Sequence, residues 1–184
     1  MNISIFGGSQ PKPGEPAYEE AFLLGQTLGS AGYTVLTGGY MGTMEAVSKG
    51  AHQAGAHVIG VTCDQIEAWR RVKANVWVKE ERRCSTLDQR IMTLINNCDA
   101  ALALPGGPGT LTEISLMWNL LLTQSIPARP LVLIGPGWKS TFDSFFEALG
   151  AYVPAGQRGY IRFAKDALSG FSILNTLMSG MEPF

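Results

Sequence analysis

Charged residues are scarce in this chain. They make up 16% of its 184 residues, and they nearly cancel, which leaves a formal net charge of −1 at pH 7. A protein that binds nucleic acid or an anionic membrane surface needs a basic field, and this composition offers none. The sequence also lacks an apolar run long enough to cross a bilayer. We therefore expect neither a nucleic-acid partner nor a membrane partner.

Cysteine is equally sparse, with only Cys63, Cys84 and Cys98, an odd number without the spacing of metal ligands. This usage favours a reducing cytosol over a disulfide framework. Residues 1–6 are interpreted as a first strand and not as a signal peptide, because no basic segment precedes the apolar residues. We expect a cytoplasmic protein with no metal site and no cofactor.

The hydrophobic content of 46% is that of a globular protein, and the length fits one domain over residues 1–184. Short apolar runs alternate with helical patterns. The expected strands are 3–6, 34–37, 57–61, 100–104, 131–134 and 161–164, and the expected helices are 17–31, 43–54, 86–97, 110–123, 139–149 and a C-terminal helix. Residues 62–84 fit neither pattern well, and 75–79 are a candidate for a short edge strand. This alternation predicts an α/β fold, a parallel sheet with helices on both faces.

Glycine, by contrast, is abundant and clustered. Three clusters each follow an expected strand: "FGGS" (6–9), "TGGYMGT" (37–43) and "LPGGPGT" (104–110). In open parallel sheets such strand ends share one edge, where ligands bind. Exposed N–H groups at the start of a helix favour an anion, above all a phosphate. The P-loop signature and the dinucleotide fingerprint are both missing, so a mononucleotide or a sugar phosphate is favoured over NAD.

Two charged residues lie close to these clusters. Thr110 and Glu113 have the spacing of a capping box, and by spacing alone Glu113 is more readily a helix cap than a catalyst. Ser85 and Asp88 show the same spacing at the preceding helix. Arg90, taken alone, is expected to be a solvated surface cation. The residues by themselves leave both interpretations of Glu113 open.

The glycine segments resemble those of a known family. "PGGPGTLTE" (105–113) is similar to the PGGxGTxxE motif of the LOG-like proteins, and residues 38–55 and 6–9 resemble the family's other two glycine segments. The resemblance covers about residues 2–135. It implies a Rossmann-like fold that pairs into homodimers, and a phosphoribohydrolase activity. Such enzymes cleave the N-glycosidic bond of cytokinin riboside 5′-monophosphates or of AMP. Relatives in the same superfamily bind nucleotides or carry the molybdenum cofactor.

The resemblance also implies roles for individual residues. Glu113 closes the motif and corresponds to the family's catalytic glutamate, and Arg90 in "LDQRIM" corresponds to its catalytic arginine. The next residue is Ile91, where the family has lysine. A carboxylate can stabilise the oxocarbenium-like ribose of the transition state, and an arginine can hold phosphate or ribose oxygens. The expected substrate-binding residues are Gly8, Ser9, Gly38, Gly39, Gly42, Gly106, Gly107, Gly109 and Thr110.

A non-catalytic alternative stays open: the same fold can bind a nucleotide or carry a phosphate-bearing cofactor such as molybdopterin. Lysine decarboxylase, an older label of the family, is rejected because no lysine lies in a context typical of pyridoxal phosphate. Residues 69–71 are interpreted as a solvated loop, although they could cover a substrate. His52 and His57 are interpreted as a surface and a half-buried histidine, respectively, with no role in metal binding.

Overall fold

The computed structural model describes residues 1–180. Within this range the chain forms seven strands: β1 (Asn2–Phe6), β2 (Thr34–Thr37), β3 (Val58–Cys63), β4 (Glu80–Cys84), β5 (Ala100–Ala103), β6 (Leu131–Ile134) and β7 (Ile161–Ala164). The helices are α1 (Pro16–Ser30), α2 (Thr43–Gln53), α3 (Asp64–Arg70), α4 (Leu87–Asn96), α5 (Pro108–Leu122), α6 (Pro136–Leu149), α7 (Ala155–Arg158) and α8 (Ala167–Ser179), with one 3₁₀ turn at Gly150–Tyr152. The alternation expected from the sequence is confirmed.

All seven strands join one parallel sheet in the order β4-β3-β2-β1-β5-β6-β7. The chain begins in the middle of the sheet, winds outward to β4, and then returns to the other side of β1 to form β5. The strand order therefore reverses between β1 and β5, and such a switch point opens a crevice at the carboxyl ends of the strands. This is a Rossmann-like α/β fold, as the sequence predicts.

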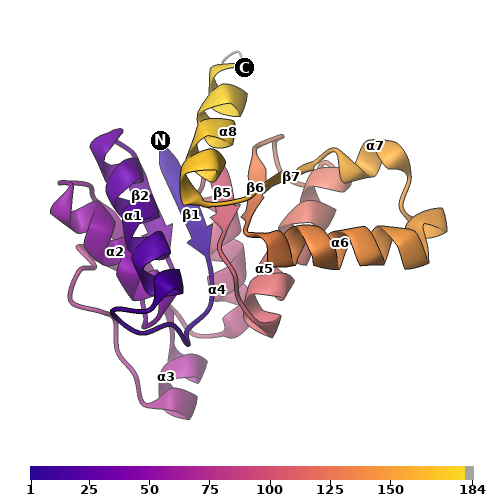
Figure 1. Ribbon diagram of the computed structural model, residues 1–184. Coiled ribbons are helices and arrows are strands. Elements are labelled where there is room, and N and C mark those ends of the chain that lie inside the picture. The colour runs from indigo at the N-terminus through magenta and orange to yellow at the C-terminus, as the bar shows by residue number, and fades with distance from the viewer. Residues whose placement is uncertain (181–184) are drawn as a thin grey trace.

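Helices cover both faces of the sheet (Figure 1). On one face, α1, α2 and α8 bury residues such as Ile3 and Leu102. On the other face, α4, α5 and α6 bury the alternate residues, such as Phe6 and Ala101. Because neighbouring residues of a strand point to opposite faces, burial on both faces accounts for the unbroken apolar runs in the sequence. Helix α3 lies beyond the carboxyl ends of the strands, at the bottom of the view.

The structure corrects the prediction for residues 75–79, which form no strand. The edge strand is β4, five residues further on, and it pairs with β3. The backbone N–H of Asn75 donates to the Gly39 carbonyl at 2.7 Å, and its side-chain amide donates to the carbonyls of Gly39 and Tyr40. These contacts hold the start of the segment against the second glycine cluster. Lys79, its last residue, donates from its N–H to the Val58 carbonyl of β3 at 2.9 Å, just before β4 begins.

Two predicted helix caps are also wrong. Helix α5 begins at Pro108, with Gly107 as its N-cap and no side-chain cap, so Thr110 and Glu113 do not form a capping box. Proline is favoured in the first turn because its missing N–H needs no partner there. Helix α4 begins at Leu87 after Thr86, again without a side-chain cap, so Ser85 is not the N-cap. Glu113 is therefore free for another role.

Candidate active site

The three glycine clusters meet at the switch point. The backbone N–H of Gly8 donates to the Pro105 carbonyl at 3.1 Å, and the Gly8 carbonyl accepts from both the N–H and the hydroxyl of Thr43 at 2.9 Å each. A side chain on Gly42, whose φ is +75°, would run into the backbone of Ser9. Bare backbone is needed here because three loops approach one another at hydrogen-bond distance.

Glu113 lies in the second turn of α5 and faces inward. Only 7% of the residue is exposed, and its Oε1 lies 3.7 Å from Nη1 of Arg90. Burial raises the pKa of the Glu113 carboxyl to about 7, against the opposing pull of the Arg90 charge. A carboxyl group with this pKa can give or accept a proton near neutrality, as a general acid or base must.

Arg90, from α4, is buried as well, so it is not the surface cation that the sequence alone suggests. It is 6% exposed, its Nε donates to the Val61 carbonyl at 2.8 Å, and its Nη2 lies 3.8 Å from the Met44 sulfur. A side chain at Gly38 would collide with the guanidinium. Within residues 1–180, the two Nη groups have no oxygen acceptor at hydrogen-bond distance. They are therefore available to a ligand.

The loop before α5 offers backbone to a ligand. Gly106, Gly107 and Gly109 are exposed, and a Cβ at Gly107 or Gly109 would meet open space. The first N–H groups of a helix have no partner within the helix, and the helix dipole makes this end attractive to an anion. Thr110 is nearly buried and lies close to the Cα of Gly106. The loop thus presents exposed backbone at the start of a helix, beside a buried carboxyl group.

The other predicted substrate-binding residues divide into two groups. Ser9 and Gly42 line a cleft of about 450 Å³, together with residues 10–13 and with Met41, Glu45, Arg70 and Val72. Gly38 and Gly39 contact protein groups instead: Gly38 leaves room for Arg90, and the Gly39 carbonyl accepts from Asn75. These two glycines shape the site and are not placed to line the cleft.

Two features of the site were missed or undervalued in the sequence. Residues 64–70 form α3, and Arg70 at its end donates from Nη1 to the Ser9 hydroxyl at 2.9 Å, across the cleft. Arg70 was interpreted as part of a solvated loop, and the basic pair next to Trp69 was the only signal for it. His52 is half-buried on α2 and His57 is exposed, which is the reverse of the predicted burial. His57 lies 2.9 Å from a carboxylate oxygen of Glu80, and neither histidine lines the cleft.

Fold and site together define a class: a Rossmann-like α/β protein with glycine loops at the switch point around a buried arginine–glutamate pair. The SLOG cluster4 family model matches residues 1–122. The chain belongs to this family, and the resemblance to LOG proteins in the sequence is confirmed.

Curated relatives agree with this assignment. The chain is 32% identical to cytokinin riboside 5′-monophosphate phosphoribohydrolase LOG3 of Arabidopsis thaliana, over 86% of this chain and 71% of the relative. It is 34% identical to cytokinin riboside 5′-monophosphate phosphoribohydrolase LOG of Oryza sativa subsp. japonica, over 79% of this chain and 60% of the relative. The chain thus spans about three fifths to seven tenths of the length of these relatives.

Among solved structures, the molybdenum cofactor binding protein of Rippkaea orientalis matches with a TM-score of 0.74 at 22% identity, over 96% of both chains. The Moco carrier protein of Chlamydomonas reinhardtii matches with a TM-score of 0.72 at 24% identity, over 98% of both chains. At this identity the likeness shows that the fold is shared.

Proposed function

We propose that this protein hydrolyses the N-glycosidic bond of a nucleoside 5′-monophosphate and releases the free base and ribose 5-phosphate. One observation carries the proposal: the buried Glu113 carboxyl, with its pKa raised to about 7, lies 3.7 Å from Arg90 beside an open glycine-rich helix start. Carboxyl groups with strongly raised pKa values cluster at catalytic sites. The names of the curated relatives support the same reaction.

The residue types suit each step of this chemistry. As the bond between C1′ and the base nitrogen breaks, its electron pair leaves with the base, and positive charge builds on the ribose ring. The Glu113 carboxylate stabilises that charge, or takes a proton from the attacking water. The free Nη groups of Arg90 orient the ribose or phosphate oxygens. The phosphate binds the backbone N–H groups of residues 106–110 at the start of α5.

The test is a panel of nucleoside 5′-monophosphates incubated with the purified protein, with release of free base as the readout. Glu113→Gln removes a negative charge that is needed mainly in the transition state. We expect the rate to fall about a hundredfold or more, with nucleotide affinity nearly unchanged.

Asp143→Asn is the matched control, because Asp143 of α6 also pairs with a cation, Lys139, but is half exposed. We expect it to hydrolyse at the wild-type rate. The proposal is refuted if wild type releases no base from any monophosphate, or if Glu113→Gln is as fast as wild type.

A second candidate is a non-catalytic protein that binds a nucleotide or carries a phosphate-bearing cofactor such as molybdopterin. Ile91 favours it, because this residue stands where the family has lysine and packs into the apolar core with only 6% exposed. The site therefore has no second cation beside Arg90 from this position. Tight nucleotide binding without any release of base would support this candidate over the enzyme.

The predicted homodimer stays a prediction, because one chain is described. Trp118 of α5 belongs to the core: its indole N–H donates to the Gln157 carbonyl at 3.0 Å, and its ring packs on Phe142. The mass in solution at micromolar concentration tests the dimer, and a monomeric mass would contradict it.

No helix in residues 1–180 is long and apolar enough to cross a membrane. The cytoplasmic location also stays a prediction.

A further inference from the structure

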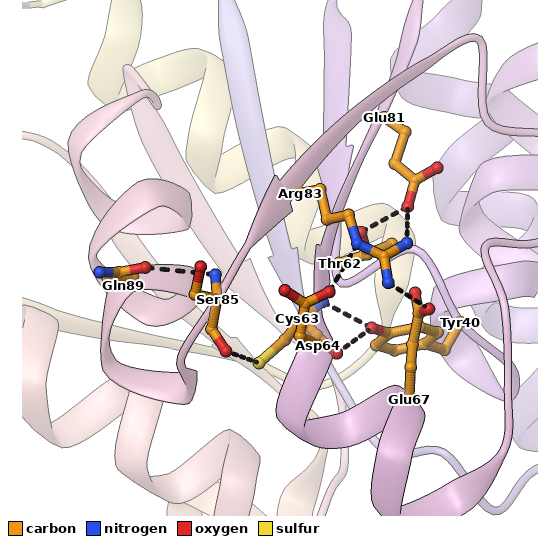
Figure 2. Close-up of polar contacts among 9 residues, drawn as sticks. All are labelled: Tyr40, Thr62, Cys63, Asp64, Glu67, Glu81, Arg83, Ser85 and Gln89. Carbon is orange, nitrogen blue, oxygen red and sulfur yellow. Dashed lines mark hydrogen bonds and ion pairs between the residues drawn. The ribbon is translucent and has the colours of Figure 1, made fainter.

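Tyr40, in the second glycine cluster, is held at its hydroxyl group. The residue is 4% exposed, and its hydroxyl accepts from the backbone N–H of Cys63 at 2.6 Å and donates to the Cys63 carbonyl at 3.2 Å (Figure 2). Both contacts are made where β3 passes into α3. A phenol that is fixed at its far end has a ring of defined position.

The junction that holds Tyr40 is itself fastened to the edge strand. Arg83 of β4 donates from Nε to Asp64 at 2.6 Å and from Nη2 to Glu67 at 2.9 Å, both in α3 (Figure 2). On the neighbouring residues, the Thr62 hydroxyl donates to a Glu81 oxygen at 2.6 Å. The hydroxyl of Tyr40 is thus tied to a braced part of the fold.

The ring of Tyr40 faces the site. Its centroid lies 5.7 Å from Cζ of Arg90, within the range of a cation–π contact. Among residues 1–180, the other polar contacts of Arg90 are the hydrogen bond from Nε to the Val61 carbonyl, the weaker contact of Nη2 with the Met44 sulfur, and the ion pair of Nη1 with Glu113 at 3.7 Å. A guanidinium with one strong anchor can pivot about it, and the ring restricts that rotation.

We infer that Tyr40 is a positioning residue that holds the Arg90 guanidinium against Glu113. The inference rests on the proposed function for its catalytic meaning, but its physical content is the geometry of Arg90. The charged or titratable groups that face Tyr40 or Arg90 are Glu67, Cys63 and Glu113. If the ring is lost, Arg90 moves relative to Glu113, and the carboxylate loses the cation that stabilises it.

The first experiment compares Tyr40→Leu and Tyr40→Phe in base release as a function of pH. Tyr40→Leu removes the ring, so we expect kcat at pH 7 to fall about tenfold. The midpoint at which activity rises with pH should move upward, because less of Glu113 is ionised near neutrality. KM should change less than kcat. Tyr40→Phe keeps the ring but loses both hydroxyl contacts with Cys63, so we expect its rate and its midpoint to lie between those of Tyr40→Leu and those of wild type.

The matched control is Tyr18→Leu, a buried tyrosine on α1 that is 2% exposed and belongs to the core on the opposite face of the sheet. We expect it to lower stability without moving the pH midpoint. If Tyr40→Leu does not fold, Tyr40→Met takes its place, since methionine fills apolar space flexibly. The inference is overturned if Tyr40→Leu keeps the wild-type rate and midpoint, or if Tyr18→Leu moves the midpoint equally.

A second readout separates this inference from the proposed function. If wild type releases no base, the proposed function fails, and the pKa of the Glu113 carboxyl is then measured by NMR with ¹³C-labelled glutamate. Glu113→Gln assigns the signal. A higher pKa in Tyr40→Leu than in wild type supports the positioning role without any activity, and an equal pKa in both proteins overturns it.

Discussion

Two arginine–carboxylate groups lie at the same end of the sheet and differ in almost every respect. Arg83 meets Asp64 at 2.6 Å, and both side chains are about half exposed, at 54% and 50%. Arg90 and Glu113 are 3.7 Å apart, with side chains only 7% and 9% exposed. The shorter contact is thus the one in water, and the longer contact is the one inside the protein.

Distance alone therefore does not determine how much an ion pair contributes to stability. Water and salt screen the exposed pair, so its net contribution to stability is small despite its geometry. The buried pair lies in a medium of low dielectric constant, where each charge depends on the other and the pKa of the carboxyl moves to about 7. A buried carboxyl group whose pKa is raised by burial and lowered by a nearby cation is typical of a functional site. The exposed Arg83, by contrast, holds α3 against β4.

Removal of each arginine gives the largest contrast. Arg90→Ala leaves Glu113 buried without its cation, so we expect the free energy of unfolding to fall by about 3–5 kcal/mol near pH 8. Arg83→Ala should lower it by less than about 1 kcal/mol, because its carboxylates remain solvated. Denaturation in urea measures both values. Equal losses in the two variants would contradict the expectation that the buried arginine contributes more to stability than the exposed one.

The pH dependence of stability reports on the carboxyl group of the buried pair, Glu113. Because the pKa of Glu113 is raised from its ordinary 4.5 to about 7, the folded protein holds this proton more tightly than the unfolded chain does. Between these two pH values the unfolded chain loses the proton first, so this group's contribution to stability falls as the pH rises, by about 3 kcal/mol in all.

The Glu113→Gln variant has no titratable carboxyl group at this position. We therefore expect the variant to gain stability relative to wild type from pH 4.5 to pH 7 and to run parallel to it above that range. Urea denaturation at a series of pH values provides the measurement. Parallel curves over the whole range would show that Glu113 titrates normally.

The smallest expected effect concerns salt. At low ionic strength, Asp64→Asn should lower the free energy of unfolding by about 0.2–1 kcal/mol, and this loss should disappear near 1 M salt. The loss caused by Arg90→Ala should change little, since counterions do not enter the buried site. A loss in Asp64→Asn that is independent of salt would mean that Asp64 acts by packing or by capping α3.

Much of the fold was predictable because strands buried on both faces leave unbroken apolar runs, as Ala100–Ala103 and Leu131–Ile134 do. The edge strand β4 was not predictable in this way. Its sequence, Glu-Glu-Arg-Arg-Cys, carries four charges in five residues. Charges are tolerated there because the strand has only one neighbour and an exposed side, and charged edges also discourage further strand pairing.

The candidate site was predictable to the extent that it follows from a local motif. The motif carries Glu113 and the glycine loop, whereas Arg90 was linked to them by the resemblance to the LOG-like proteins and not by spacing. Spacing misassigned Glu113 as a cap, because the chain makes the helix start two residues earlier at Pro108. Tyr40 gave no signal, because its role depends on Cys63 and Arg90, which are 23 and 50 positions away.

The hydrogen bonds that join the three glycine loops through Gly8 have a consequence for how this protein can change. One residue receives from the second loop and gives to the third, so the loops share a single junction. An insertion in any one loop would displace the other two, and a loop transplanted alone from a relative would arrive without its partners. Natural variants and designed chimaeras should therefore inherit the three loops as a set, with the variation in length confined to the connections at the opposite edge of the sheet.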